Sequence, residues 1–287
     1  MKKLHALLII LIITMLSYSQ VSACTSFAVY SQNTVYGMNF DYPDTKIRYA
    51  ISNIDGVKVF HMDFDIYGNL ASTVAMNENG FFVAMEQLYP DAPIVEELSE
   101  NQIDMHDFAA RSPFYNNSVD DILEYISNKQ VVNHYLTTHD LFADRTGNAM
   151  VLEAGDNENV ISMINGKFIV MTNFAYSELK NKNYRDVYGV GSDRYGAAYE
   201  YISEHIDTFD IDKGFDVLQN TIQEFSAYPT QSSMVFDPEK GEVFIAVKQD
   251  FARIWRVNIE KGTIEGFKGF ENPVEMQIGK SAFLQMS

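Results

Sequence analysis

The stretch Val21-Ser22-Ala23-Cys24-Thr25-Ser26-Phe27 joins an apolar leader to the only cysteine of the 287-residue chain. Cleavage between Ala23 and Cys24 would leave a chain that begins with a thiol and a free α-amino group on one residue. The thiolate is the reactive form of cysteine, and an α-amine with a pKa of roughly 7.7 to 8.0 can take the thiol proton near neutral pH. The sequence therefore predicts a nucleophile that carries its own base, and we expect the rest of the chain to fold around it.

Residues 1–23 have the pattern of a secretory signal peptide. Two lysines near the start precede an apolar run over residues 4–16, and Val21 and Ala23 place small residues three positions and one position before Cys24. The apolar run is shorter than the roughly 20 residues that a membrane-spanning helix needs. We therefore predict export, cleavage before Cys24, and a secreted or periplasmic protein.

The same residues also resemble the motif that precedes the lipidated cysteine of bacterial lipoproteins. Lipidation followed by acylation of the amine would block both groups of Cys24, so the two interpretations exclude each other. Lipoproteins usually continue after the cysteine with a flexible polar tether, whereas Phe27-Ala28-Val29-Tyr30 is typical of a strand. A lipid-anchored protein stays open as the alternative.

The chain is strongly acidic. It contains 39 Asp and Glu against 21 Lys and Arg, a formal net charge of −18, and the leader holds two of the lysines and no acid. Such a surface repels nucleic-acid phosphates and anionic membranes, which argues against both as partners. A single cysteine excludes an intramolecular disulfide. The length of residues 24–287 suits one domain.

The hydrophobic pattern predicts an α+β fold. Short strands with tight turns are expected at 27–30, 34–38, 57–64, 81–87, 140–143, 149–153, 160–164 and 167–171. Helical periodicity follows Ser118, which is typical of an N-cap with Asp121 three residues later, and returns over 194–206 and 212–225. Further strands are expected at 232–237, 242–247, 254–259 and 263–267. This order predicts two antiparallel sheets covered by helices.

Metal sites are poorly supported by the sequence. The six histidines include no His-Glu-x-x-His pattern, and His134 and His139 are not spaced to share a helical face. The segment Asp63-Phe64-Asp65-Ile66-Tyr67-Gly68 imitates the start of a calcium loop, but Tyr67 and Val74 provide no carboxylate where that loop needs one. We interpret it as a strand that ends in a turn.

A series of short motifs, in chain order, resembles a known family. The motifs are Cys24-Thr25, Gly37-Met38-Asn39-Phe40-Asp41, Met76-Asn77-Glu78-Asn79-Gly80, Ala143-Asp144-Arg145-Thr146-Gly147 with Glu153, Met171-Thr172-Asn173, Ser192-Asp193-Arg194-Tyr195, and Thr230-Gln231-Ser232-Ser233-Met234-Val235-Phe236-Asp237-Pro238. The family is that of the N-terminal-nucleophile hydrolases that cleave linear amides, namely bile salt (choloylglycine) hydrolases and penicillin V acylases. The related acyltransferase and acid ceramidase-like branch shares the same opening. Each motif alone is weak, and the ordered set carries the resemblance.

The resemblance implies a four-layer αββα sandwich with Cys24 on the first strand, at the mouth of a cleft between the sheets. It implies that Cys24 is the nucleophile, that Asp41 orients the terminal amine, and that the side-chain amide of Asn173 donates to the oxyanion. Arg194 matches an arginine that supports the nucleophile electrostatically. Gln87 takes the place of the family's second oxyanion donor, which is usually an asparagine. No cofactor is implied.

One position departs from the family pattern. Met38 stands where the family normally has an arginine that helps to hold the thiolate, so its absence should raise the pKa of Cys24. Arg48 is a candidate for reaching back to replace it. In the expected acyl pocket, Tyr89-Pro90 and Phe114-Tyr115 are predicted loop residues that could form the walls.

The implied activity is hydrolysis of a linear, non-peptide amide through a thioester, with a small-molecule substrate that has an apolar acyl group. An acyltransferase on the same scaffold, in which an amine intercepts the thioester, is one alternative. A lipid-anchored, catalytically silent binding protein is the other. Relatives often form homo-oligomers, which makes one possible here.

Overall fold

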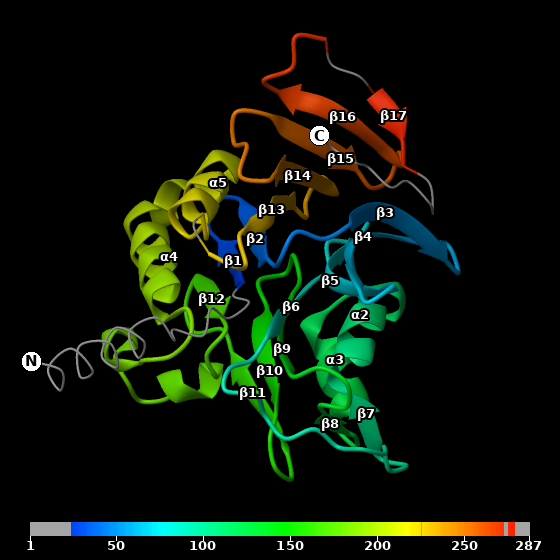
Figure 1. The fold of residues 1–287 in the computed structure, drawn as a ribbon, viewed down its shortest axis with the longest axis vertical. Helices are drawn as coiled ribbons and strands as arrows, with labels where there is room; N and C mark the ends of the chain where they lie inside the picture. Colours follow the sequence, from blue (N-terminus) through cyan, green and yellow to red (C-terminus); the bar gives the residue numbers. More distant parts are fainter. Residues whose placement is uncertain (1–23, 225, 273–274, 279–287) are drawn as a thin grey trace, which may run out of the picture.

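The computed structural model describes residues 24–224, 226–272 and 275–278, and the predicted signal peptide lies outside these residues. Two large antiparallel sheets face each other, and each sheet is covered on its outer face by a pair of helices (Figure 1). The predicted four-layer αββα sandwich is therefore confirmed.

The first sheet contains the strand that begins next to Cys24. Its strand order within the described residues is β12-β1-β2-β13-β14-β15-β16-β17. The bounds are β12 Phe168–Thr172, β1 Thr25–Tyr30, β2 Thr34–Asp41, β13 Thr230–Asp237, β14 Glu242–Val247, β15 Ile254–Asn258, β16 Thr263–Lys268 and β17 Glu275–Gln277. Helices α4 (Ser192–His205) and α5 (Ile211–Asn220) pack on strands β12, β2 and β13 of this sheet.

The second sheet has the order β11-β10-β9-β6-β5-β4-β3. Its strands are β11 Asn159–Met163, β10 Ala149–Ala154, β9 Thr138–Ala143, β6 Phe82–Gln87, β5 Asn69–Asn77, β4 Val57–Ile66 and β3 Ile47–Ile54. Helix α2 (Met105–Tyr115) packs across β5, β6 and β9, and α3 (Val119–Ile126) packs in the same outer layer. A short parallel pair, β7 (Gln102–Asp104) with β8 (Gln130–Val132), flanks these helices.

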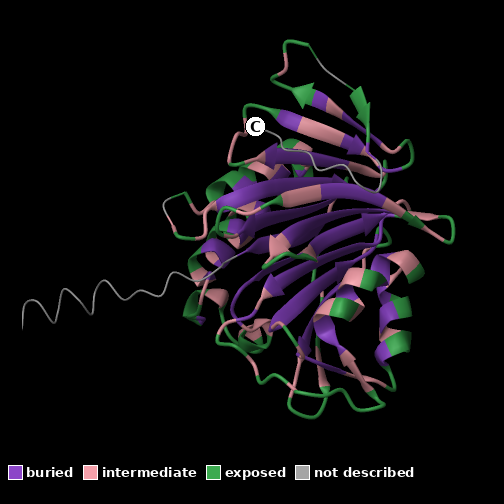
Figure 2. Ribbon diagram, turned by 45° about the vertical axis from the view of Figure 1, so that its right-hand side comes forward, coloured by how far each residue is buried: buried purple, intermediate pink, exposed green. Residues whose placement is uncertain are grey.

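The strands that face each other are buried on both sides, whereas exposed residues gather in loops and on the outer helix faces (Figure 2). Along β1, Cys24 and Ala28 belong to the core between the sheets, while Phe27 and Val29 pack under helix α4. This alternation follows from the two-residue period of a strand. It explains why the central strands are almost continuously apolar in sequence.

Most predicted elements are confirmed to within a few residues. The capping box of α3 is present, with Ser118 accepting from the amide of Asp121 and the Asp121 carboxylate accepting from the amide of Ser118. The segment that imitates a calcium loop is the end of β4, where Tyr67 and Gly68 form the hairpin turn with positive φ angles of 53° and 89°.

Several elements differ from the sequence-based expectation. Helix α5 ends at Asn220, earlier than predicted, and Phe225 lies outside the described residues. Strands β3 and β5 were not predicted. Helix α2 was not predicted either, and it includes Phe114 and Tyr115, so these residues do not belong to a loop. The helical sequence pattern of α2 is weak because Pro113 lies inside the helix. The start of the helix is stabilised by its N-cap Asp104, whose side chain accepts from the amide of Asp107.

Short 3₁₀ helices occur at Tyr176–Leu179, Tyr184–Asp186 and Ile206–Thr208. Across the part of the chain that the structure describes, we find no helix with the length and apolar character needed to cross a membrane.

Candidate active site

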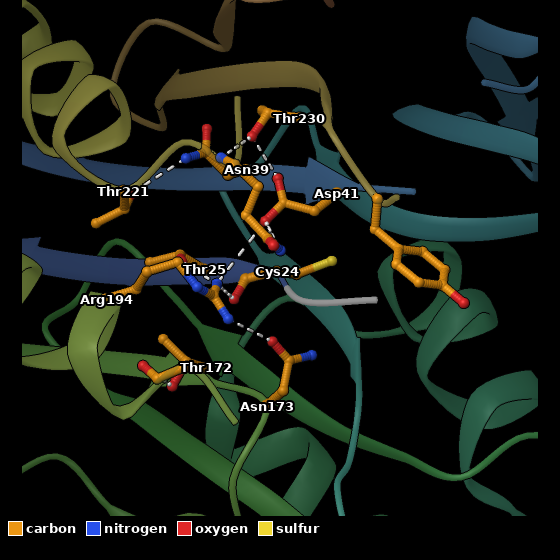
Figure 3. A network of polar contacts seen from close by, with 12 residues as sticks. Cys24, Thr25, Asn39, Asp41, Thr172, Asn173, Arg194, Thr221 and Thr230 are labelled. Carbon is orange, nitrogen blue, oxygen red and sulfur yellow. Dashed lines mark hydrogen bonds and ion pairs between the residues drawn. The ribbon is translucent and has the colours of Figure 1, made fainter. Parts of the chain in front are cut away.

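Cys24 lies directly before β1, between β2 and β12, and only 4% of its surface is exposed. Its strand neighbours bring the other candidate residues to it, because Thr25 is paired with Asn39 of β2 and with Thr172 of β12. Asp41 and Asn173, which follow these partners in the chain, therefore lie at the same end of the sheet as Cys24 (Figure 3).

Arg194 connects these residues. It lies in the first turn of α4 and points inward, so that it is 8% exposed. Its Nη1 donates to the carbonyl oxygen of Cys24 and, at 2.7 Å, to Oγ1 of Thr25. Its Nη2 donates to Oδ1 of Asn173 at 3.0 Å, and Nη1 lies 3.8 Å from Oδ2 of Asp41 (Figure 3). A cation near a helix N-terminus opposes the helix dipole, so these contacts must compensate for its position.

The helix begins at a glycine that leaves room for this guanidinium. Gly191 has a φ of 82°, and a Cβ atom there would lie 2.4 Å from Nη2 of Arg194. Only glycine fits both the left-handed backbone and the close approach. The oxygen of Gly191 in turn accepts from Oγ1 of Thr172 at 3.1 Å.

Asp41 is the last residue of β2 and is completely buried. Oγ1 of Thr230 donates to Oδ1 at 2.6 Å, and Nε2 of Gln223 donates to Oδ2 at 3.1 Å. Burial raises the pKa of Asp41 to about 6, against the opposing effect of the Arg194 charge.

Asn173 and Gln87 are joined by one hydrogen bond. Nδ2 of Asn173 donates to the carbonyl oxygen of Gln87 at 2.7 Å. A side-chain amide has two N–H groups, so one donor of Asn173 is left for a ligand. The carbonyl oxygen of Asn173 accepts from the amide of Tyr89 at 2.7 Å, which holds the segment after β6 against the site.

A cavity of about 200 Å³ opens beside the sulfur of Cys24. Its walls are mainly apolar, with Phe40, Phe64, Ile66, Met85 and Leu136, and the side of Gln87 closes one end. The expectation that Phe114 and Tyr115 form a wall is wrong, because Phe114 packs in the layer between sheet and helices and Tyr115 is 65% exposed.

Among the described residues, Arg194 is the arginine whose charge lowers the pKa of Cys24, and Arg48 does not take the place of the arginine that Met38 displaces. Met38 is fully buried in the core between the sheets. Arg48, the candidate substitute, lies on β3 and donates through Nε to Oδ2 of Asp63 at 2.8 Å. The hypothesis that Arg48 reaches back to the nucleophile is therefore wrong.

The sequence reasoning missed Glu86. It is fully buried, and burial raises its pKa to about 8. The pKa of the Cys24 thiol is raised well above its ordinary value by burial first, then by Glu86 and Asp41, while the backbone amide of Asp41 and the charge of Arg194 lower it. The sequence did hold a signal for Glu86. Side chains alternate along β6, so Glu86 points to the same core between the sheets as Phe82 and Ala84.

Two further observations limit the chemistry. Asn39 lies on the same face of β2 as Asp41, turned to helix α5, where it donates to the carbonyl oxygen of Leu218 at 2.8 Å and accepts from Ser233 at 2.6 Å. In the described ranges, no group of three or more His, Cys, Asp or Glu side chains is placed to hold a metal ion.

The sequence matches no protein-family model and no curated protein. Solved structures do match. A conjugated bile acid hydrolase mutant from Clostridium perfringens is 15% identical with a TM-score of 0.64, covering 90% of this chain and 98% of the other. A second variant of that hydrolase is 14% identical with a TM-score of 0.64, covering 92% and 100%.

The penicillin V acylase from Agrobacterium tumefaciens is 15% identical with a TM-score of 0.63, and the match covers 91% of this chain and 100% of the acylase. Identities this low show a common fold and leave the activity to be argued from the site. The two facing antiparallel sheets, the helix layers and the place of Cys24 at the start of β1 thus give this chain the N-terminal-nucleophile hydrolase fold.

Proposed function

We propose that the protein is a cysteine amidohydrolase that cleaves a linear, non-peptide amide of a small molecule with an apolar acyl group. The observation that supports this most directly is the position of Cys24, which borders an apolar cavity and is tied through Arg194 to Asp41 and Asn173. Similarity in fold to a bile acid hydrolase and a penicillin acylase adds support.

The proposal requires cleavage before Cys24, because the buried thiol needs a base. Its pKa is raised, so at neutral pH the sulfur carries its proton. A free α-amine on the same residue can take that proton when the sulfur attacks the amide carbon. The immediate start of β1 at Thr25 supports a cysteine held in the fold rather than one on a flexible lipid tether.

The reaction then proceeds in two halves. As the C–S bond forms, the carbonyl π electrons move to oxygen, and the resulting oxyanion accepts from the free N–H of Asn173 and from the Gln87 amide. The C–N bond breaks and the leaving amine takes the proton from the α-ammonium. A water molecule then gives a proton to the α-amine and attacks the thioester carbon, the C–S bond breaks to release the acid, and the α-ammonium returns the proton to the sulfur.

The test is a panel of N-acyl amides incubated with the exported protein and with Cys24→Ala and Cys24→Ser. We expect release of free amine by the natural protein, none by Cys24→Ala, and a rate lowered by orders of magnitude for Cys24→Ser. Hydrolysis that persists in Cys24→Ala would refute the nucleophile.

Mass spectrometry of the exported protein tests the required processing. A free amino-terminal cysteine is expected, whereas a diacylglyceryl adduct would replace the hydrolase by the lipoprotein alternative. Product analysis with an added amine separates hydrolysis from acyl transfer, because a transferase would form a new amide.

A further inference from the structure

Glu86 is a buried carboxyl group with no cationic partner in an ion pair among the described residues. It comes from β6 and points between the sheets, where the Ser26 hydroxyl of β1 makes a weak polar contact with it from the facing sheet. Within the described residues, neither oxygen of Glu86 has a hydrogen-bond partner in good geometry. An ionised carboxylate that is removed from water without a partner is strongly unfavourable. The uncleaved chain therefore lacks a cation that could pair with an ionised Glu86.

The groups around Glu86 do not supply the missing charge. Arg194 is the cation whose field favours its ionised form, but that guanidinium already contacts Asp41, Asn173 and the Cys24 carbonyl. On β9, His139 is the strand partner of Glu86, but its Nδ1 lies 3.4 Å from Glu153 and its Nε2 has no partner.

The other charged neighbours are acidic. Asp41 opposes ionisation of Glu86, and Glu86 in turn opposes ionisation of Cys24 and of Asp140. Asp41 and Glu86 therefore share one guanidinium. The site is short of one positive charge if both carboxyl groups are ionised.

We propose that the missing partner is the α-ammonium group that Cys24 acquires on cleavage, which makes Glu86 a positioning residue of the nucleophile. This inference rests on the proposed function, because it requires the free amine. Cleavage turns an uncharged amide nitrogen into an amine that binds a proton near neutral pH. The proton of the Glu86 carboxyl passes to the amine, and two carboxylates then face two cations.

In the reaction, the ammonium first returns its proton to the Glu86 carboxylate, and the free amine then takes the thiol proton as the sulfur attacks. The ionisation state of Glu86 should therefore differ between the uncleaved chain and the cleaved chain. With the amide intact, Glu86 keeps its proton, since burial raises its pKa to about 8. In the cleaved chain, the α-ammonium group places a positive charge next to the sulfur. The buried Met38, which stands where the family has an arginine, provides no such charge.

Thermal unfolding of two forms tests this without any substrate. One form begins at Cys24, and the other begins at Gln20, so that the nitrogen of Cys24 stays an amide. In the extended form at pH 8, Glu86→Gln should raise Tm by about 3 °C, because it removes a desolvated acid. In the cleaved form the same substitution should lower Tm, because it breaks a buried ion pair. A change of the same sign and size in both forms would overturn the proposal.

Asp140→Asn is the matched control. Asp140 is also fully buried with two unpartnered oxygens, but it shares the face of β9 with Phe142, away from the core between the sheets. It should change Tm equally in both forms. Unequal changes would show that the terminus acts on buried acids in general and not on Glu86.

The unsubstituted protein provides a second measurement if Glu86→Gln does not fold. An acid whose folded pKa is raised from 4.5 to about 8 binds more protons in the folded state, so the free energy of unfolding falls as pH rises across this window. We expect this fall in the extended form and a clearly smaller one in the cleaved form. Equal slopes would count against the ion pair.

These outcomes are separable from the proposed function. If Glu86→Gln changes Tm with opposite signs in the two forms but no amide is hydrolysed, the ion pair is supported and the hydrolase is refuted. If amides are hydrolysed but the two Tm changes have the same sign and size, the hydrolase is supported and the ion pair is refuted.

Discussion

Arg194 is the residue through which the polar side chains of the site are connected. A single guanidinium contacts the carbonyl oxygen of Cys24, the hydroxyl of Thr25 next to it, and Asn173 of the neighbouring segment. Because it is planar and donates in fixed directions, it also fixes the orientation of the Asn173 amide, whose oxygen it occupies. The nitrogen of Asn173 is thereby turned towards the cleft, where an oxyanion would form.

Replacement of Asn173 tests this arrangement at the residue scale. For Asn173→Ala we expect kcat to fall by about 10²–10³, the typical effect of removing one oxyanion donor, with a smaller change in KM. The measurement is steady-state hydrolysis of the best amide from the panel. Gln87→Asn is the companion variant, because it keeps the amide and shortens its arm. A rise in KM alone, with kcat unchanged, would contradict the assignment of Asn173.

The start of helix α4 is the element that places Arg194. Gly191→Ala adds a Cβ atom 2.4 Å from Nη2 of Arg194 at a φ of 82°. We expect a loss of stability of about 2 kcal/mol and at least a tenfold loss of activity, because backbone and guanidinium must both shift. Urea unfolding and amide hydrolysis measure the two effects.

Gly196→Ala, in the same helix, is the matched control. Its nearest atom to an added Cβ is 3.9 Å away, and alanine favours a helix, so it should stabilise by about 0.5–1 kcal/mol with activity retained. An activity loss equal to that of Gly191→Ala would mean that helix α4 as a whole, and not the guanidinium, responds.

The β3–β4–β5 region depends on one ionised carboxylate. Asp63 accepts from Arg48, His61 and Ser72, and these partners lower its pKa to about 2 despite the opposing effect of burial. The folded state binds this proton more weakly than the unfolded state, so its stabilisation is complete above about pH 4 and is lost as pH falls towards 2.

Asp63→Asn should therefore remove about 2 kcal/mol of the acid-induced loss of stability, while lowering stability at pH 7. Unfolding free energies measured from pH 7 down to pH 2 test this, with Asp107→Asn as an exposed carboxylate control. An unchanged acid slope in Asp63→Asn would show that other carboxylates dominate.

At the scale of the whole molecule, the negative charge should select the leaving amine. The chain has a formal charge of −18, and none of the described residues that line the cavity is a lysine or arginine. Arg194 is occupied by partners within the fold. A carboxylate or sulfonate on the leaving amine would thus meet an unfavourable field, whereas an ammonium would be attracted.

We expect kcat/KM for an N-acyl ethylenediamine to exceed that for the N-acyl glycine with the same acyl chain by at least tenfold at low salt, as electrostatic steering allows. The ratio should shrink as salt screens the field. A preference for the glycine conjugate, or a ratio that does not change with salt, would contradict this expectation.

The sequence predicted most strands of the two inner layers, because strands buried on both faces are apolar along much of their length. It also predicted helix α3, whose start is fixed by the local hydrogen bonds of Ser118 and Asp121. Helix α2 was not predicted because its stability comes from packing on β5, β6 and β9, which are separate segments of the chain. Strand β3 was not predicted because it lies at the edge of the second sheet and is held there by pairing with β4.

The composition of the site divides in the same way. The sequence by itself determined that Cys24 directly precedes a strand and predicted a leader before it, and the ordered motifs predicted Asp41, Asn173, Arg194 and Gln87 as the residues that act with it. Only the tertiary structure decided that Arg48 belongs to Asp63, that Phe114 lies outside the cleft, and that Glu86 is buried beside the thiol. The physical reason is that motif and period are local properties of the chain. The pairing of charges and the shape of a cavity arise only where segments far apart in sequence meet in a medium that excludes water.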